Sequence, residues 1–273
     1  MNINSALIIP DYFKTFIENV TFNNFNLLYL DDSFEELTKN IPIFLVNETT
    51  IDKIRNDLYL SLLNDYLNSY RDTFEGCKKK EFLNRKYNGI CPPTEWLGLY
   101  TRTELDNLIP TSHPVIFVCP ERIKSITNNQ MDYMFILTKV IIHELMHALM
   151  DNGGKRPDID SELYIWMEES FANKLTLMVI HNYIMRLKIM KQDEELFLDL
   201  VIKFVKNQPP MYALGYELFE KDIGWWIHWK KFKSLNDHKN KVQDIENLLN
   251  YLKANFKNVD EKKANELLDK LWF

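Results

Sequence analysis

The sequence predicts an α+β fold that is mainly helical, with a small sheet packed on one long helix. Apolar residues recur at helical spacing through most of the chain, and only three short runs favour strands. Glycine is scarce, with 7 among 273 residues, which disfavours an enzyme that cradles a nucleotide in glycine-rich loops. The length and a hydrophobic share of 46% suffice for a full-sized core.

The three runs expected to form strands lie in the first half of the chain. The run at 41–46 precedes apolar residues at helical spacing over 51–67, so 1–90 is expected to be an N-terminal α/β region. The runs at 96–101 and 114–119 are rich in aliphatic, β-branched and aromatic residues, and a polar stretch with prolines separates them. We expect them to form a hairpin or two neighbouring strands.

Two long helices are expected next, over 129–151 and 160–190. Asn-Gly-Gly at 152–154 would end the first helix and reverse the chain, because glycine readily adopts the backbone conformation that follows a helix end. The rest of the chain, from about 194, is expected to form three or four further helices. One of them is expected to begin near Pro-Pro at 209–210.

Charge and cysteine content favour a cytoplasmic protein. A net charge of −6 argues against a binder of nucleic acid that relies on phosphate contacts. Cys77, Cys91 and Cys119 are odd in number and irregular in spacing, so we expect reduced thiols. The apolar run at 6–9 is too short for a signal peptide or a membrane span. We therefore expect no nucleic-acid partner and no membrane, while the oligomeric state is open.

Aromatic and basic residues gather at 225–231, where three tryptophans precede two lysines. Such a run can form a face that binds a membrane surface or nucleic acid. Core packing is the preferred interpretation, because the run is short and the chain is acidic overall.

The segment at 140–150 contains His-Glu-x-x-His among apolar residues. Residues four apart on a helix lie about 40° apart around its axis, so His143 and His147 can bind one metal ion. Glu144 is offset from them, so its carboxylate can act as a general base on a water instead of binding the metal. Because burial of polar groups in an apolar helix is costly, this pattern indicates a function.

A catalytic zinc site takes three protein ligands and a water, so a third ligand has to come from elsewhere. We select Glu169 on the second long helix because it shares a face with Asn173. The Asn173 carbonyl would accept the free N–H of a ligating imidazole and fix its tautomer, and Ala172 would let the two helices approach closely. Glu168, about 100° around the axis, is expected to be solvated or structural. The prediction is one Zn²⁺ per chain.

The residues His143, Glu144, His147, Glu169 and Asn173 resemble the gluzincin family of zinc metallopeptidases. In that family His-Glu-x-x-His is followed downstream by a Glu that precedes an Asp or Asn by three or four residues. The match covers about thirty residues directly. A metzincin would need a third His soon after the second, with a Gly between them, and that pattern is missing from the sequence.

The resemblance implies a zincin-like catalytic region over 91–273 with a helical C-terminal subdomain, and hydrolysis of peptide bonds with Glu144 as the general base. Tyr212 begins a segment that resembles the Tyr-x-x-Gly element of some gluzincins, where the tyrosine hydroxyl stabilises the oxyanion. Tyr216 and His228 are the alternative oxyanion donors. For each of these three residues, a purely structural role is the competing interpretation.

Three activities fit this pattern. The first is a zinc-dependent peptidase, whose peptide or protein substrate would suit an edge strand near 97–101 that resembles the cleft-lining strand of gluzincins. The second is a regulatory module that binds a peptide or partner without cleaving it, although such a module has no need of Glu144. The third is a hydrolase of a non-peptide amide. The region 1–90 would select substrates or regulate, and the choice between endopeptidase and exopeptidase is open.

Overall fold

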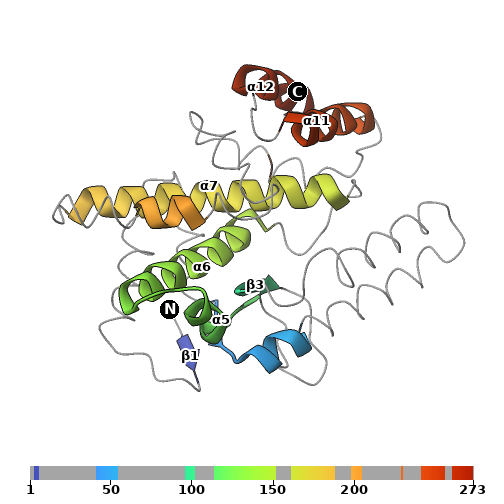
Figure 1. Cartoon of the computed structure of the whole chain (residues 1–273). Coiled ribbons are helices and arrows are strands. Elements are labelled where there is room, and N and C mark those ends of the chain that lie inside the picture. Colours follow the sequence, from blue (N-terminus) through green and yellow to red (C-terminus); the bar gives the residue numbers. More distant parts are fainter. Residues whose placement is uncertain are drawn as a thin grey trace, which may run out of the picture. The chain divides into compact units, whose positions relative to one another are not determined.

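The structure is mainly helical with one small mixed sheet, which confirms the predicted fold class (Figure 1). The chain divides into two compact units, which we treat separately. Unit 1 comprises Met1–Thr15 and Glu36–Ile141, and unit 2 comprises Phe16–Glu35 and Ile142–Phe273. The predicted boundary near residue 90 stays a prediction. The computed structural model describes residues 3–5, 41–54, 96–101, 114–151, 161–187, 198–204, 229, 241–255 and 260–272.

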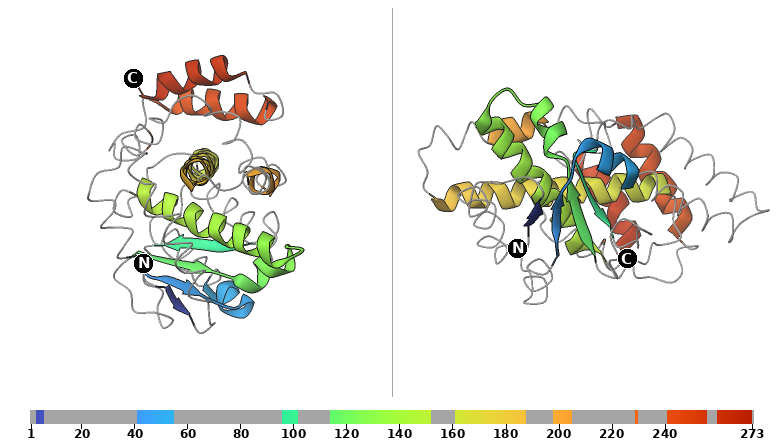
Figure 2. Two further views of the ribbon diagram at one scale, coloured as in Figure 1. Left: turned by 90° about the vertical axis from the view of Figure 1, so that its left-hand side faces the viewer. Right: turned by 90° about the horizontal axis from the view of Figure 1, so that it is seen from below.

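Unit 1 contains a four-stranded sheet whose strands are adjacent in the order β1-β2-β4-β3 (Figure 2). The strands are β1 (Ile3–Ser5), β2 (Ile43–Leu45), β3 (Gly98–Thr101) and β4 (Val115–Val118). The strand β2 pairs in parallel with both β1 and β4, whereas β3 runs antiparallel to β4 with Leu99 opposite Phe117. The two later strand runs are therefore neighbours, as predicted, and β3 lies at one edge of the sheet.

The inner strand β4 forms the centre of this unit. All four of its residues are buried, which is typical of a strand covered on both faces. Val115 and Phe117 pack with Ile54 from the helical segment 48–54, and the Phe117 ring stacks on Phe44 with centroids 5.7 Å apart. The part of helix α6 (Gln130–Met150) that belongs to unit 1 packs against this sheet, as expected.

A buried arginine joins three segments of unit 1. Arg122 lies in α5 (Pro120–Ser125), and its Nη2 donates to Asp52 Oδ2 at 2.8 Å. Its Nη1 donates to the backbone oxygen of Trp96 at 3.2 Å, next to the start of β3. Because a guanidinium has several donors in a fixed plane, one side chain can hold two separate segments at once.

Helix α6 begins and ends within one residue of the predicted range. Asn129 precedes it, and the Asn129 Oδ1 accepts the backbone N–H of Asp132 at 2.9 Å, which satisfies one of the open donors of the first turn. Among the described residues, α6 is the one helix that is long and apolar enough to cross a membrane by length and composition alone. Core helices of soluble proteins pass the same test, and 78% of its most apolar stretch is buried inside the protein.

Unit 2 is helical where the structure describes it. Helix α7 (Ser161–Leu187) confirms the second long predicted helix, and the later residues form α11 (Val242–Asn255), α12 (Glu261–Trp272) and the helical segment 198–204. Helices α11 and α12 pack together, and Leu248, Leu252, Ala264 and Leu267 are buried. The predicted turn at 152–154 and the predicted helix start at 209–210 lie outside the described residues.

Asn129→Ala is expected to lower the free energy of unfolding by about 1 kcal/mol, because the open N–H of Asp132 loses its acceptor. Urea denaturation followed by circular dichroism measures this change. Asn128→Ala is the matched control, since Asn128 is an exposed neighbour, and it should change the unfolding free energy by less than about 0.5 kcal/mol. Equal losses in the two variants would contradict the capping role of Asn129.

Candidate metal centre

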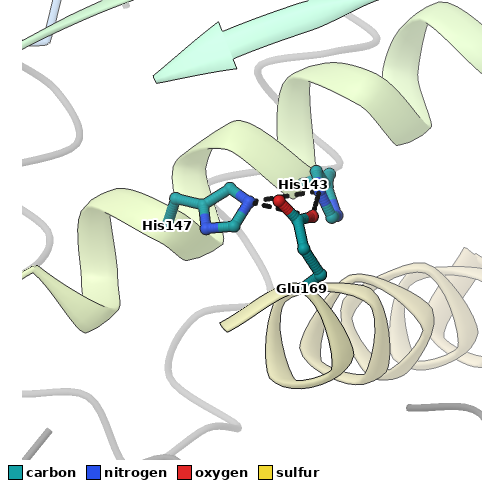
Figure 3. A group of neighbouring side chains, drawn as sticks. All are labelled: His143, His147 and Glu169. Carbon is teal, nitrogen blue, oxygen red and sulfur yellow. Dashed lines mark hydrogen bonds and ion pairs between the residues drawn. The ribbon is translucent and has the colours of Figure 1, made fainter. Parts of the chain in front are cut away.

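His143, His147 and Glu169 converge within unit 2 (Figure 3). The two histidines lie one turn apart on α6, and Glu169 projects from α7 toward both rings. Glu169 Oε2 is 3.1 Å from His143 Nε2 and 3.5 Å from His147 Nε2, and the two Nε2 atoms are 3.2 Å apart. One atom of each side chain therefore faces a common point, and the structure brings together the three residues chosen from the sequence.

The spacing of these three atoms fits a tetrahedral metal ion. Nitrogen or oxygen ligands about 2.0–2.1 Å from a tetrahedral zinc ion lie about 3.3–3.4 Å apart. The observed separations of 3.1, 3.2 and 3.5 Å bracket this value. Two imidazoles and a carboxylate are also a donor set that suits zinc and other first-row transition metals. The three side chains can therefore hold a metal ion without a large rearrangement.

The centre is largely buried. The side chain of His143 is 9% exposed, compared with 13% for His147 and 20% for Glu169. The apolar residues of α6 around the histidines, including Ile142, Leu145 and Met146, are fully buried. A metal ion held here would therefore be largely shielded from bulk water.

Charge pairing dominates the protonation of this cluster. Burial lowers the pKa of His147, but the nearby carboxylates of Glu169, Glu168 and Glu144 together outweigh burial and raise this pKa to about 10. Burial raises the pKa of Glu169, but the two imidazoles, His147 most strongly, hold it well below its usual range. His147 therefore carries a proton at neutral pH, and a metal ion has to displace this proton in order to bind its nitrogen.

Glu144 lies next to His143 on α6 and is buried. It does not belong to the group of three side chains whose ligand atoms converge. This placement agrees with a carboxylate that is kept out of the ligand set, but its role as a general base stays a prediction.

Glu168, which was expected to be solvated or structural, is buried, so the structural alternative holds. Its Oε1 lies 3.8 Å from His147 Nδ1, and this approach was not predicted. Its Oε2 accepts a hydrogen bond from Trp229 Nε1. The only signal in the sequence was its place beside Glu169, because the face of α7 that is buried depends on packing partners far along the chain.

Trp229 is fully buried and stacks on Phe171, with ring centroids 6.2 Å apart. The core-packing interpretation of the run at 225–231 is therefore confirmed for Trp229, the one residue of that run that the structure describes.

Asn173 follows Glu169 by one turn of α7 and is fully buried. Among the described side chains, its Oδ1 accepts no hydrogen bond from either imidazole. Its contact with a ligating histidine stays a prediction.

Several other candidates lie outside the described residues, namely Tyr212, Tyr216, His228, Cys77 and Cys91. Their roles stay predictions. Cys119 is buried and forms no disulfide, and burial raises the pKa of its thiol.

Comparisons of this chain with models of known protein families, with curated proteins and with solved structures find no match. The class that the structure supports is therefore defined by the site itself. It is a helical α+β protein with a buried His-His-Glu group, arranged as in His-Glu-x-x-His metal sites.

Zinc binding is expected to strengthen as the pH rises, because binding requires His147 to lose its proton. From about pH 6 to about pH 9, below the raised pKa of His147, the apparent affinity should increase by up to about tenfold per pH unit. Competition with a chromophoric chelator of known pH dependence measures this slope. An affinity that stays constant over this range would contradict the protonation assigned to His147.

Proposed function

We propose that this protein is a zinc-dependent metallopeptidase of the gluzincin type. The observation that carries the proposal is the separation of 3.1–3.5 Å between the Nε2 atoms of His143 and His147 and the Oε2 of Glu169. The sequence supports it further, because Glu144 and Asn173 stand at the remaining positions of the gluzincin pattern.

Zinc is the metal that we propose, at one ion per chain. Two neutral imidazoles and one carboxylate form the three-ligand set of many catalytic zinc sites, which leave a fourth position open. A closed structural site would need a fourth protein ligand, and the converging group among the described residues has three members.

In the proposed reaction, bound zinc would lower the pKa of a water and polarise the carbonyl of the scissile bond. Glu144 would take a proton from that water on its carboxylate and pass it to the leaving amine. The hydroxyl of Tyr212 would donate a hydrogen bond to the developing oxyanion, with Tyr216 and His228 as the alternative donors. The role of Tyr212 follows from its resemblance to the Tyr-x-x-Gly element of some gluzincins, and that of Glu144 from its offset from the two histidines on the helix.

A peptide or protein is the proposed substrate. The strand β3 lies at an edge of the sheet, and an edge strand can bind an extended peptide by strand addition. The alternative is a module that binds a peptide without cleaving it, and the presence of Glu144 argues against it. We also propose a cytoplasmic location without nucleic-acid or membrane partners, and a selecting or regulatory role for the region 1–90.

Glu144→Gln is expected to retain zinc and the fold but to lose at least about a hundredfold in peptide cleavage, because the amide cannot take a proton from water. Mass-spectrometric profiling of a diverse peptide library measures cleavage, and elemental analysis measures bound zinc. Glu246→Gln on α11 is the matched control, since Glu246 is exposed and outside the centre, and it should cleave like the wild type.

Cleavage by Glu144→Gln at the wild-type rate would contradict the proposed mechanism. A wild-type chain that binds one zinc ion and cleaves nothing in a diverse library would instead favour the binding module or a non-peptide substrate.

A further inference from the structure

The imidazole of His147 lies between two carboxylates that belong to consecutive residues of α7. Its Nε2 is 3.5 Å from Glu169 Oε2, and its Nδ1 is 3.8 Å from Glu168 Oε1. Each ring nitrogen of His147 therefore faces its own carboxylate. Because Nε2 faces the other two candidate ligand atoms, Nδ1 is the nitrogen left to interact with the surrounding protein.

The second oxygen of Glu168 is held by a residue far along the chain. Trp229 Nε1 donates to Glu168 Oε2 at 2.5 Å, and the two residues are 61 positions apart in the sequence. An indole N–H can only donate, so Glu168 Oε2 is the acceptor in this contact. The other oxygen of Glu168, Oε1, faces His147. Trp229 is itself fully buried and stacked on Phe171.

We propose that Glu168 is a positioning residue for His147, and that Trp229 anchors Glu168 in this task. Glu168 accepts the N–H of His147 Nδ1, which fixes the tautomer of the ring and directs its Nε2 toward the metal. The inference rests on the proposed zinc centre. It adds to that proposal the two residues that orient one of the zinc ligands.

The geometry separates this role from that of a fourth ligand. Glu168 approaches His147 from the Nδ1 side, whereas the converging group is formed by Nε2 atoms and Glu169. The distance of 3.8 Å exceeds a direct hydrogen bond, and closing it to about 2.9 Å takes a side-chain shift of about 1 Å. Metal binding at Nε2 leaves the proton of the neutral ring on Nδ1, where Glu168 is the nearby acceptor.

The test measures the affinity of the full chain for Zn²⁺ by chelator competition, and the visible absorption spectrum of its Co²⁺ form. Glu168→Gln preserves the size of the side chain but removes its charge, and it is expected to weaken Zn²⁺ binding by about 10–100-fold. Trp229→Phe keeps an aromatic ring in the core and removes the N–H donor, and it is expected to weaken binding in the same direction, by up to about tenfold. Both variants are expected to change the Co²⁺ spectrum.

Thr176→Val is the matched control. Thr176 is fully buried on the same helix, and its hydroxyl donates to the backbone oxygen of Ala172. Loss of this local hydrogen bond tests the effect of removing a buried polar contact of α7 that does not involve His147. The variant is expected to keep the Zn²⁺ affinity and the Co²⁺ spectrum of the wild type.

The inference would be overturned if Glu168→Gln and Trp229→Phe both bind Zn²⁺ within about twofold of the wild-type affinity and both keep the wild-type Co²⁺ spectrum. If Glu168→Gln does not fold, Trp229→Phe decides the outcome, because its substitution is the milder of the two. The Zn²⁺ affinity of His147→Ala is the reference for a chain in which the centre lacks one ligand. If the wild type binds metal no better than His147→Ala, the proposed function fails and this inference fails with it.

Discussion

The grouping of two imidazoles and a carboxylate in a largely buried part of unit 2 is the constraint on which the rest of the site depends. Taking such groups out of water costs several kcal/mol each unless they pair with one another. Glu169 offsets this cost because one of its carboxylate oxygens, Oε2, faces both His143 and His147. The electrostatic attraction that holds the group together also places its three donor atoms at the spacing of a tetrahedral ion.

The surroundings of the centre give its two histidines different environments. His143 is the more buried ring, whereas His147 has Glu168 on one nitrogen and the converging group on the other. Glu169 is the most exposed of the three side chains, although it too is largely buried. A catalytic metal site needs ligands that are held firmly in place, and the contacts on both nitrogens of His147 are of this kind.

The sequence allowed the centre to be predicted wherever the relevant geometry is local. His143 and His147 are one helical turn apart, so their common direction follows from helix geometry alone. Glu169 was selected because it shares a helix face with Asn173, which is again a local relation. The role of Glu168 depends on Trp229, which is 61 residues away and belongs to no local pattern. The strand β1 was missed for the same reason, because its three residues are defined by pairing with β2 and not by their own propensity.

X-ray absorption at the zinc edge of the zinc-loaded chain would show directly which atoms surround the metal ion. We expect four nitrogen or oxygen neighbours at about 2.0–2.1 Å, with the outer-shell scattering of two imidazoles. In His147→Ala we expect the signal of one imidazole to disappear. Sulfur neighbours at about 2.3 Å, or a spectrum that does not change in His147→Ala, would contradict a centre built from His143, His147 and Glu169.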